Sequence, residues 1–520
     1  MVSKISGFKH KLKVIFPDPA FYKILLWLFV ILGIIFRLRQ FLFNRSLWSD
    51  EALLANNFLF LSPYRLIRGS LVFDQAAPSG FLILVFLVTK LFGLYDYTLR
   101  FIPIVSAILS VVLAYYLSKY VYKTFVGQLV FVGSISISPI LIYYSSEFKQ
   151  YSSDLFVTLL ILWASYSSKT RKNGNLFLGL LGAICIWFSI PSVIVLASVG
   201  TVMLLELLIQ NKKKEAFQLL GVIVFWLVNF GLFFLFTLRN TASNTNLVVY
   251  WRGSFAPLLP NSIQALRWYP ESLLGLTYLS FWQSFPRGPG PIELWFSLQN
   301  FLLLGIVVFG GVYAFLRSRK IFLIGTLMII INLSLSAFHL YPFSNRLLLY
   351  LTPVVYLFAG MFFEGLFCVE RYWLKIVTVV TTSILLIATV KEPIKVAIQP
   401  NNFSDIKTAL KIVARKHVPN DNLITSVWGR APFDFYRRFY QLNDVNVVQI
   451  KQNDDRAIYY VETLCNQKVL GRTWILFIFT HVGEKELLES LKDSARLIDT
   501  WNVGDPIYLF NINNLDFCAQ

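Results

Sequence analysis

Two adjacent carboxylates, Asp50 and Glu51, follow the first long apolar stretch of this 520-residue chain, in the run Ser46–Ala52. A carboxylate placed where an apolar helix bundle first meets water can act as a general base on a substrate at the membrane surface. The pair also fits the start of a helix capped by Ser49, because the helix dipole favours acids in the first turn. Both interpretations can hold together, since a helix start would keep the base rigid.

Further ionisable side chains follow in two places. Asp74 lies in the run Phe73–Gly80, where it fits either an Asx-type turn before a Pro-Gly break or a substrate contact. Glu147, Lys149 and Asp154 are spaced to share roughly one flank of a helix at the start of an apolar stretch. An internal ion pair is the simpler explanation, but ionisable groups at the end of a membrane span usually mark a pathway or site.

Several arginines fall at the surface that we predict to lie outside the membrane. They are Arg37, Arg39, Arg100, Arg252 and Arg346. Long cationic side chains can reach out to lipid head groups, which would account for some of them. Arg346 ends the short turn His339–Arg346, and its planar guanidinium suits phosphate oxygens.

The composition is that of a membrane protein with many spans. The chain is 56% hydrophobic and 17% aromatic, and its formal net charge is +19. From Asn401 onward there are 14 Lys or Arg and 14 Asp or Glu, so the positive excess lies entirely in the first 400 residues. Most of it falls in short loops between apolar stretches, which indicates membrane orientation and argues against nucleic-acid binding.

Apolar stretches long enough to form membrane helices occur throughout the first 391 residues. The predicted spans are 21–43, 101–118, 126–144, 154–168, 175–190, 192–210, 217–238, 296–316, 321–340, 347–366 and 373–391. The first follows several lysines but has no cleavage site, so we interpret it as a retained anchor. With the N-terminus cytoplasmic and the short stretch 81–94 interfacial or re-entrant, the basic clusters of the loops all fall inside.

This topology predicts two domains. A transmembrane domain over 1–395 carries a first external loop at 44–99 and a second at 239–292. A soluble domain over 396–520 lies outside the membrane, with a helix near Asp405–His417, a second at Glu484–Leu491 and apolar runs typical of strands. Cys465 and Cys518 could pair if this domain lies in an oxidising compartment.

Motifs of several enzyme classes are absent from the sequence. It has no Walker loop, dinucleotide glycine fingerprint, paired-cysteine or His-Glu-x-x-His metal motif, or Gly-x-Ser-x-Gly elbow. We therefore expect an activated substrate to supply the energy of any reaction. No metal site is predicted and no cofactor is certain, although the carboxylates could hold a divalent ion.

Four segments together resemble GT-C-type glycosyltransferases. These are Trp48–Glu51, Phe73–Pro78, Glu147–Asp154 and Tyr341–Arg346. The chain looks most similar to glycosyltransferase family 39, the branch related to protein O-mannosyltransferases and to the aminoarabinose transferase of lipid A. The resemblance covers about residues 20 to 390. It implies a GT-C-like fold of about 11–13 membrane helices with an extracytoplasmic α/β domain.

The resemblance also implies an activity and a location. Such enzymes move a sugar, a hexose or a pentose, from a polyprenyl-phosphate carrier to a lipid, glycan or protein acceptor. They are integral membrane proteins, and we expect this chain in a bacterial cytoplasmic membrane with membrane lipids as its other partners. In these relatives the Asp of the Asp-Glu pair is the base, which corresponds to Asp50. An acid after the third span is functional in some of them and corresponds to Asp154.

The chemistry of the residues agrees with this expectation. A sugar on a phosphate has a good leaving group, so one base and phosphate-binding cations would suffice for an inverting displacement. We expect Asp50 to be the base, with Glu51 and Asp154 orienting acceptor or sugar. The predicted substrate-binding residues are Asp74, Glu147, Lys149, Arg252 and Arg346.

One departure from the relatives concerns the donor phosphate. Where they often have Lys-Pro-Pro or His-Pro-Pro, this chain has Gln75-Ala-Ala-Pro78, so other residues must bind that phosphate. Three alternatives stay open at this point. The chain could be a polysaccharide polymerase or ligase that uses lipid-linked sugars, a lipid or sugar transporter, or a scaffold with a degenerate site.

Overall fold

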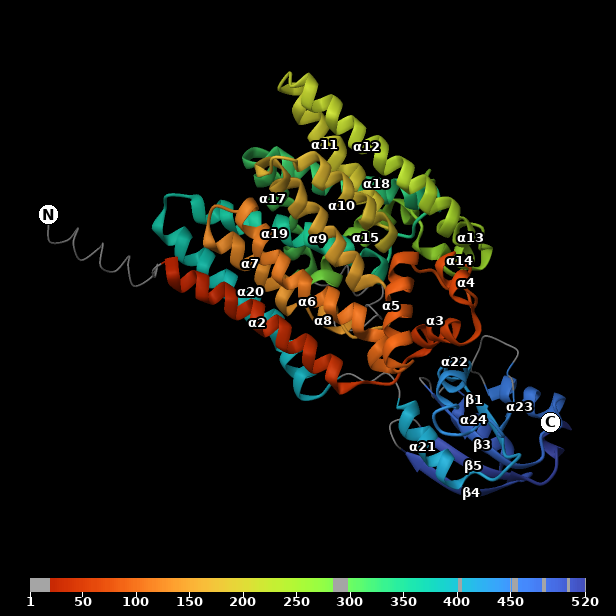
Figure 1. Cartoon of the computed structure of the whole chain (residues 1–520). Helices are drawn as coiled ribbons and strands as arrows, with labels where there is room; N and C mark the ends of the chain where they lie inside the picture. Colours follow the sequence, from red (N-terminus) through yellow and green to blue (C-terminus); the bar gives the residue numbers. More distant parts are fainter. Residues whose placement is uncertain are drawn as a thin grey trace. The chain divides into compact units, whose positions relative to one another are not determined.

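The described part of the chain forms two compact units (Figure 1). The computed structural model describes residues 19–283, 298–400, 405–448, 450, 457–478, 483–502 and 506–519. One unit, the helical unit, contains residues 19–43, 63–70 and those described between 76 and 400. The other, the α/β unit, joins 44–62 and 71–75 to the described residues after 404. The predicted first external loop is thus divided between the units.

Eight stretches of the described chain are helices long and apolar enough to cross a membrane. They are α2 (Pro19–Phe43), α6 (Asp96–Val121), α11 (Ser192–Ile209), the stretch from α12 (Lys213–Phe233) through η2 (Phe234–Leu238) to α13 (Arg239–Ala242), α17 (Leu298–Arg317), α18 (Arg319–Ala337), η4 (Asn345–Leu351) with α19 (Thr352–Cys368), and α20 (Tyr372–Ile398). Each overlaps a predicted span. The prediction of an integral membrane protein with many helices is confirmed.

The other three predicted spans are shorter helices. They correspond to α7 (Phe125–Ile137) with α8 (Pro139–Tyr144), to α9 (Tyr151–Ser167) with η1 (Ser168–Thr170), and to α10 (Gly174–Phe188). The ambiguous stretch 81–94 forms α5 (Ser79–Phe92). Its 14 residues span about 21 Å at the helical rise, which is less than the roughly 30 Å of a bilayer core.

A buried arginine explains how α7 can break in the middle of the bundle. Pro139 begins α8 and has no N–H to donate to the carbonyl of Ile135, four residues earlier. The fully buried Arg37 of α2 donates to the carbonyls of Ile135 and Ser136, both at 2.8 Å, and to that of Gly33 at 2.9 Å. Arg37, predicted at the outer surface, therefore satisfies the carbonyls of the broken helix instead of reaching for lipid.

The region predicted as the second external loop contains helices. They are α13, α14 (Thr245–Tyr250), η3 (Arg252–Ser254) and α15 (Ile263–Phe281), while residues 284–292 lie outside the described part. α15 packs against α17 and α19 with its C-terminal half buried. The segment after η3 is held to the turn before η4, because Phe343 N–H donates to the Ser254 carbonyl at 2.9 Å.

The α/β unit is built on a five-stranded sheet in the order β2-β1-β3-β5-β4. Its elements after residue 404 are α21 (Ile406–Lys416), β1 (Asn422–Thr425), α22 (Val427–Tyr436), β2 (Asn446–Val448), α23 (Ala457–Asn466), β3 (Gly471–Leu476), α24 (Glu484–Leu491), β4 (Ala495–Asn502), β5 (Pro506–Ile512) and η5 (Asp516–Ala519). β1 is parallel to β2 and β3, and β5 is antiparallel to both β3 and β4. The mixed α/β domain expected here is confirmed.

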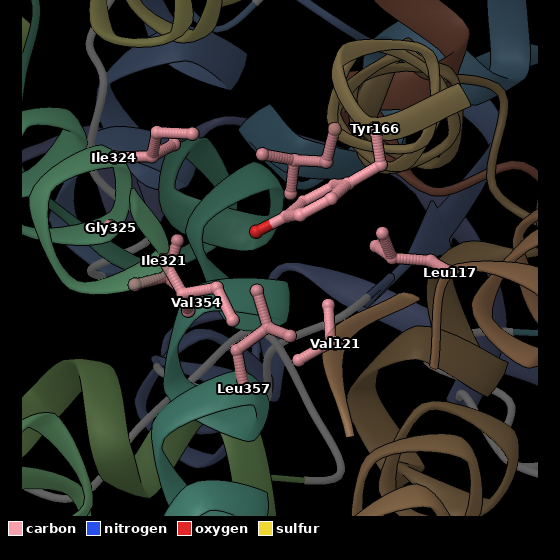
Figure 2. A pocket seen from close by; sticks show the side chains of 9 residues that line it. Leu117, Val121, Tyr166, Ile321, Ile324, Gly325, Val354 and Leu357 are labelled. Carbon is pink, nitrogen blue, oxygen red and sulfur yellow. The ribbon is translucent and has the colours of Figure 1, made fainter. Parts of the chain in front are cut away.

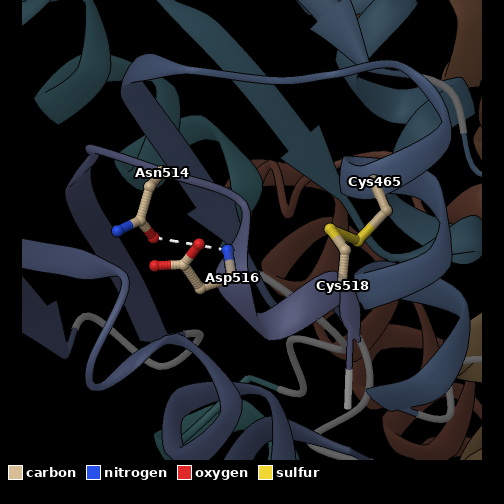
Figure 3. The surroundings of a disulfide bond; sticks show 4 residues. All are labelled: Cys465, Asn514, Asp516 and Cys518. Carbon is tan, nitrogen blue, oxygen red and sulfur yellow. Dashed lines mark hydrogen bonds between the residues drawn. A yellow bond between two sulfur atoms is a disulfide. The ribbon is translucent and has the colours of Figure 1, made fainter.

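A disulfide closes the C-terminal end of this unit. Cys465 at the end of α23 is bonded to Cys518 in η5, with Cα atoms 5.7 Å apart (Figure 3). Next to it, the Asp516 N–H donates to Asn514 Oδ1 at 3.3 Å and starts the last turn. The bond ties the chain end to a core that includes Tyr460 and Leu464 on the same helix.

Candidate active site

The predicted acid pair begins α3 (Ser49–Phe60), in the α/β unit. Glu51 is fully buried and accepts a hydrogen bond from Arg45 at 3.0 Å, itself almost fully buried. The same Glu51 oxygen accepts from the Trp48 N–H at 3.4 Å, so it also caps the start of the helix. Asp50, next in the sequence, is only partly buried. The two carboxylates therefore have different surroundings: that of Glu51 fixes the helix start, whereas that of Asp50 belongs to a less buried residue.

The segment 71–75 is held against α3 by a buried asparagine. Asn57 Oδ1 accepts from the Val72 N–H at 2.8 Å, and its Nδ2 donates to the Val72 carbonyl at 3.3 Å. Phe73 and Asp74 then adopt left-handed backbone conformations, with φ of 63° and 53°. Each costs of order 1–2 kcal/mol for a residue other than glycine, and together they turn the chain back toward α3.

This turn brings Gln75 to Asp50. Gln75 is 8% exposed, and its Nε2 donates to Asp50 Oδ1 at 3.4 Å and to the Phe73 carbonyl at 3.2 Å. Asp74, which we predicted to contact substrate, is exposed on the turn itself. Sequence reasoning identified the 73–78 motif but gave Gln75 no role.

Helix α3 is also anchored by the C-terminal part of its own unit. It packs along α22, and Asn56 Nδ2 donates to the Ala431 carbonyl at 3.1 Å. The Leu47 N–H donates to the Tyr436 hydroxyl at 2.8 Å, and Lys407 Nζ donates to the Asn44 carbonyl. The acid pair thus owes its placement to residues more than 350 positions later in the sequence.

In the helical unit, the polar segment between α8 and α9 is entirely buried. Glu147 is 0% exposed, while Lys149 and Asp154 are each 4% exposed. Ser152 Oγ donates to the Tyr144 carbonyl at 2.9 Å, and Gln150 Nε2 donates to the Ala76 carbonyl at 3.3 Å. Charged groups at such depth are tolerated only when they are compensated by one another or serve a site.

Arg346 joins this buried segment from η4, which packs against α9. The Tyr144 hydroxyl interacts electrostatically with both Glu147 and Arg346. The Arg346 guanidinium lies 5.4 Å from the ring centroid of Trp251, a cation–π distance. Arg252, the next residue, is exposed and makes no such contact among the described residues. The structure therefore brings Glu147 and Arg346 together and leaves Arg252 apart.

Tyrosines form the surroundings of Asp154 in the helical unit. Tyr341 and Tyr350 both interact electrostatically with it, and Ser189 lies beside it at the end of α10. Burial raises the pKa of the Tyr341 hydroxyl well above its ordinary value, and the charge of Asp154 adds to the effect. The sequence placed Tyr341 inside a recognised motif, but only the fold shows that it faces Asp154.

The predicted site residues are divided between the two units. Asp50, Glu51 and Asp74 belong to the α/β unit, whereas Glu147, Lys149, Asp154, Arg252 and Arg346 belong to the helical unit. Among the described residues, no group of three or more His, Cys, Asp or Glu side chains is placed to hold a metal ion.

Comparison with known proteins identifies the fold. No protein-family model matches the chain, and no curated protein matches it significantly. Among solved structures it is similar to ArnT from Cupriavidus metallidurans bound to undecaprenyl phosphate, with a TM-score of 0.53 and 11% identity over 94% of this chain and 98% of that one. The Archaeoglobus fulgidus oligosaccharyltransferase in complex with Zn and sulfate has a TM-score of 0.46 and 13% identity, over 86% and 68%.

The likeness to ArnT spans both units and shows a shared fold. The GT-C-like architecture expected from the four sequence segments is thereby confirmed.

Proposed function

We propose that this protein is an inverting glycosyltransferase that moves a sugar from a polyprenyl-phosphate carrier to an acceptor outside the cytoplasmic membrane. The observation that carries the proposal is the buried Glu147–Asp154 segment with Arg346 beside it, inside an otherwise apolar bundle. The bundle has the fold of ArnT, whose structure was solved with undecaprenyl phosphate. A lipid phosphate is the substrate class that needs both an apolar bundle and a buried cationic segment.

On the acceptor side, Asp50 is the general base. It is the less buried residue of the acid pair, and Gln75 holds one of its carboxylate oxygens. It would take the proton of the acceptor hydroxyl as that oxygen attacks the anomeric carbon from the face opposite the phosphate. Glu51, occupied by Arg45 and the Trp48 N–H, is a positioning residue that fixes the start of α3.

On the donor side, Arg346 and Lys149 stabilise the departing phosphate. The bond from the anomeric carbon to the phosphate oxygen breaks, and the leaving group keeps its electron pair as a lipid phosphate anion. A guanidinium offers two parallel N–H groups to such an anion, and a buried ammonium adds charge in a medium of low dielectric. Asp154 and Glu147 orient the sugar, whereas the exposed Asp74 and Arg252 have no role that a described contact supports.

The sidedness of the protein follows from loop charge and cysteine chemistry. The basic clusters between predicted spans assign the N-terminus to the cytoplasm and the α/β unit to the outside. The Cys465–Cys518 bond fits that assignment, since disulfides persist in oxidising compartments such as the bacterial periplasm. The sugar is a hexose or a pentose, and the acceptor is a lipid, a glycan or a protein.

Transfer from radiolabelled polyprenyl-phosphate sugars in native membranes tests the proposal. With wild-type protein we expect label to move to an acceptor. Asp50→Asn at matched expression should lower the rate by about 10²–10⁴-fold, the range for loss of a general base. Asp499→Asn, an exposed acid of the same unit, is the matched control and should transfer at the wild-type rate.

Two results would contradict the proposal. Near-normal transfer by Asp50→Asn would remove the base assignment and leave the donor side standing. Absence of transfer from every single-sugar carrier by wild-type protein would reject the function and favour a polymerase or a transporter.

A further inference from the structure

The inside of the helical unit is closely packed, whereas α12 on its outside is largely uncovered. Leu117, Tyr166 and Leu357 line a gap between α6, α9 and α19 that has room for about one water molecule (Figure 2). In the stretch Lys213–Ala242, which begins with α12, only 17% of the apolar segment is buried, against 89% for η4 with α19. Helix α12 therefore offers a long surface to the interior of the membrane.

Helix α12 is anchored to its unit along one side only. Trp226 is buried, and its indole N–H donates to the Gly179 carbonyl of α10 at 3.0 Å. Leu219 and Phe233, seven residues before and after it, are buried as well. Because residues seven apart lie on the same face of a helix, the other side of α12 faces the lipid.

One polar side chain interrupts this apolar helix near the middle of the membrane. Asn229 precedes Arg239, the next charged residue, by ten positions, which is about 15 Å along the helix and half of a roughly 30 Å hydrocarbon core. It is partly exposed, and its Nδ2 donates to the Phe225 carbonyl of its own helix at 2.9 Å. Among the described residues, its second N–H and its carbonyl oxygen have no partner, at a depth where water cannot supply one.

Other polar side chains on exposed faces of the membrane helices are satisfied within their own helix. The hydroxyls of Ser334, Thr381 and Ser383 each donate to the carbonyl four residues earlier. A hydroxyl has one hydrogen, so this bond uses its only donor, whereas a primary amide has two donors and a carbonyl oxygen. Asn229 therefore keeps a hydrogen-bonding capacity that its own helix does not use.

The residues around Asn229 suit close contact with a second helix. Gly221, Phe225 and Asn229 follow one another at four-residue intervals, so they share one flank of α12. A Cβ atom added to Gly221 would meet nothing within 4 Å, so its backbone is open to an approaching helix. Phe225 and Leu232 on the same flank are 42% and 43% exposed. A small residue, an amide and apolar side chains on one flank are the features that pair helices in lipid.

We propose that this flank of α12 is a dimerisation surface and that its partner is the same flank of a second copy of this chain. Two copies inserted in the same orientation bring their α12 helices together in parallel about a two-fold axis, so Asn229 meets Asn229 at the same depth. Each amide then donates its second N–H to the carbonyl oxygen of the other. A second copy is favoured over another membrane protein because it necessarily carries a donor and an acceptor at that depth. The inference does not depend on the proposed function, since no candidate site residue lies on α12.

A simpler explanation is that Asn229 faces the lipid alone and bonds only to Phe225. The two explanations differ in what removal of the amide does. If the amide is isolated, its removal leaves the association of the protein unchanged, whereas the loss of a paired amide weakens that association.

Energy transfer between labelled copies in phosphatidylcholine vesicles distinguishes them. Donor and acceptor dyes are attached to Cys368, the exposed free cysteine, while Cys185 is buried. With full-length wild type we expect transfer to rise with the protein-to-lipid ratio and to level off at the value of a dimer. Asn229→Leu should move the midpoint to a ratio about tenfold higher, as expected for loss of hydrogen bonds between membrane helices. Asn229→Gln keeps an amide and should restore most of the transfer.

Two further variants separate the flank from the amide. Gly221→Ile closes the approach to the backbone without removing a polar group and should weaken association by a similar factor. Thr381→Val on α20 loses a hydroxyl that its own helix satisfies, and it is the control that should keep the wild-type midpoint.

Two results would overturn the proposal. If wild-type transfer is no greater than that of randomly distributed copies, the chain is a monomer in lipid and Asn229 serves no second copy. If Asn229→Leu and Gly221→Ile both keep the wild-type midpoint, any dimer forms through another face.

Discussion

The start of α3 and the start of α9 both present acids, but they hold them in opposite ways. At α3, a buried Arg45–Glu51 pair and a cap fix the backbone, and Asp50 is left partly exposed with Gln75 as a neutral partner. At α9, all of the charged groups are buried and surrounded by tyrosines. A base must exchange protons with an acceptor that comes and goes, whereas a phosphate site gains strength from low dielectric. This contrast is what the proposed roles, an acceptor base at Asp50 and a donor-phosphate site at the start of α9, would require.

The largest effect is expected from breaking the support of α3. Arg45→Met leaves the Glu51 carboxylate buried without its cation, which should cost about 3–5 kcal/mol of stability in the α/β unit. The thermal unfolding of purified protein, followed by a probe on that unit, checks this. Arg45→Met combined with Glu51→Met should recover much of the loss. If the single variant were as stable as wild type, the ion pair would not organise this region.

A second effect concerns the α9 side. Arg346→Gln removes the guanidinium beside Glu147 and should raise the KM for the carrier lipid by about 10–100-fold, with a smaller change in kcat. Initial rates across carrier concentrations measure it, and Arg239→Gln, an exposed arginine of the same unit, is the control. An unchanged KM with a lowered kcat would move Arg346 from donor binding to the acceptor chemistry.

A third variant sharpens the role of Gln75. Gln75→Ala removes the amide that donates to Asp50, and we expect kcat to fall by about tenfold with little change in carrier KM. Because a donated hydrogen bond favours the charged carboxylate, its loss should move the acid limb of the pH–rate profile upward. Gln75→Glu should be worse than Gln75→Ala, since it sets a second acid against Asp50. A pH profile identical to wild type would mean that Gln75 is merely part of the turn.

The smallest effect on stability is expected from an exposed ion pair of the α/β unit, for comparison with the buried Arg45–Glu51 pair. Lys416 contacts Asp499 at 2.8 Å on the surface, and this hydrogen bond lowers the pKa of the Asp499 carboxyl. Its stabilisation is therefore present above the ordinary pKa of aspartate and lost as the pH falls through the lower, folded value. Asp499→Asn should be barely distinguishable from wild type in unfolding at pH 7 and indistinguishable at pH 2.

Membrane helices and fold class could be predicted because the length of an apolar stretch and the charge of a loop are local properties of the sequence. The strands of the α/β unit were more difficult to predict. In its strand β4, buried and exposed residues alternate little, and the strand is largely exposed at the edge of the sheet. No apolar run in the sequence therefore indicates it. Helix α15 lies in a region predicted to be a loop. Its polar residues Arg267 and Glu271 and its Pro270 interrupt the apolar pattern, so the sequence did not indicate that its C-terminal half is buried.

The candidate site residues were selected from motifs. Sequence reasoning gave Asp50 the role of base and Glu51 an orienting role from the resemblance, without knowing their surroundings. The burial of Arg45 and the turn at Phe73 and Asp74 show how those surroundings differ, and both depend on tertiary contacts. The membership of residues 44–62 in the α/β unit likewise rests on packing against α22, which no local pattern reveals.

The packing of α3 against α22 has a consequence for folding during synthesis. Asn56 of α3 is synthesised 375 residues before Ala431, the residue whose carbonyl it holds. At about 5–20 residues per second, the ribosome takes roughly 20–75 s to cover this interval. During that time α3 lacks the helix it packs on, so the proposed base has no fixed place. We therefore expect no activity until α22 has been synthesised, and none from a chain that stops before residue 431.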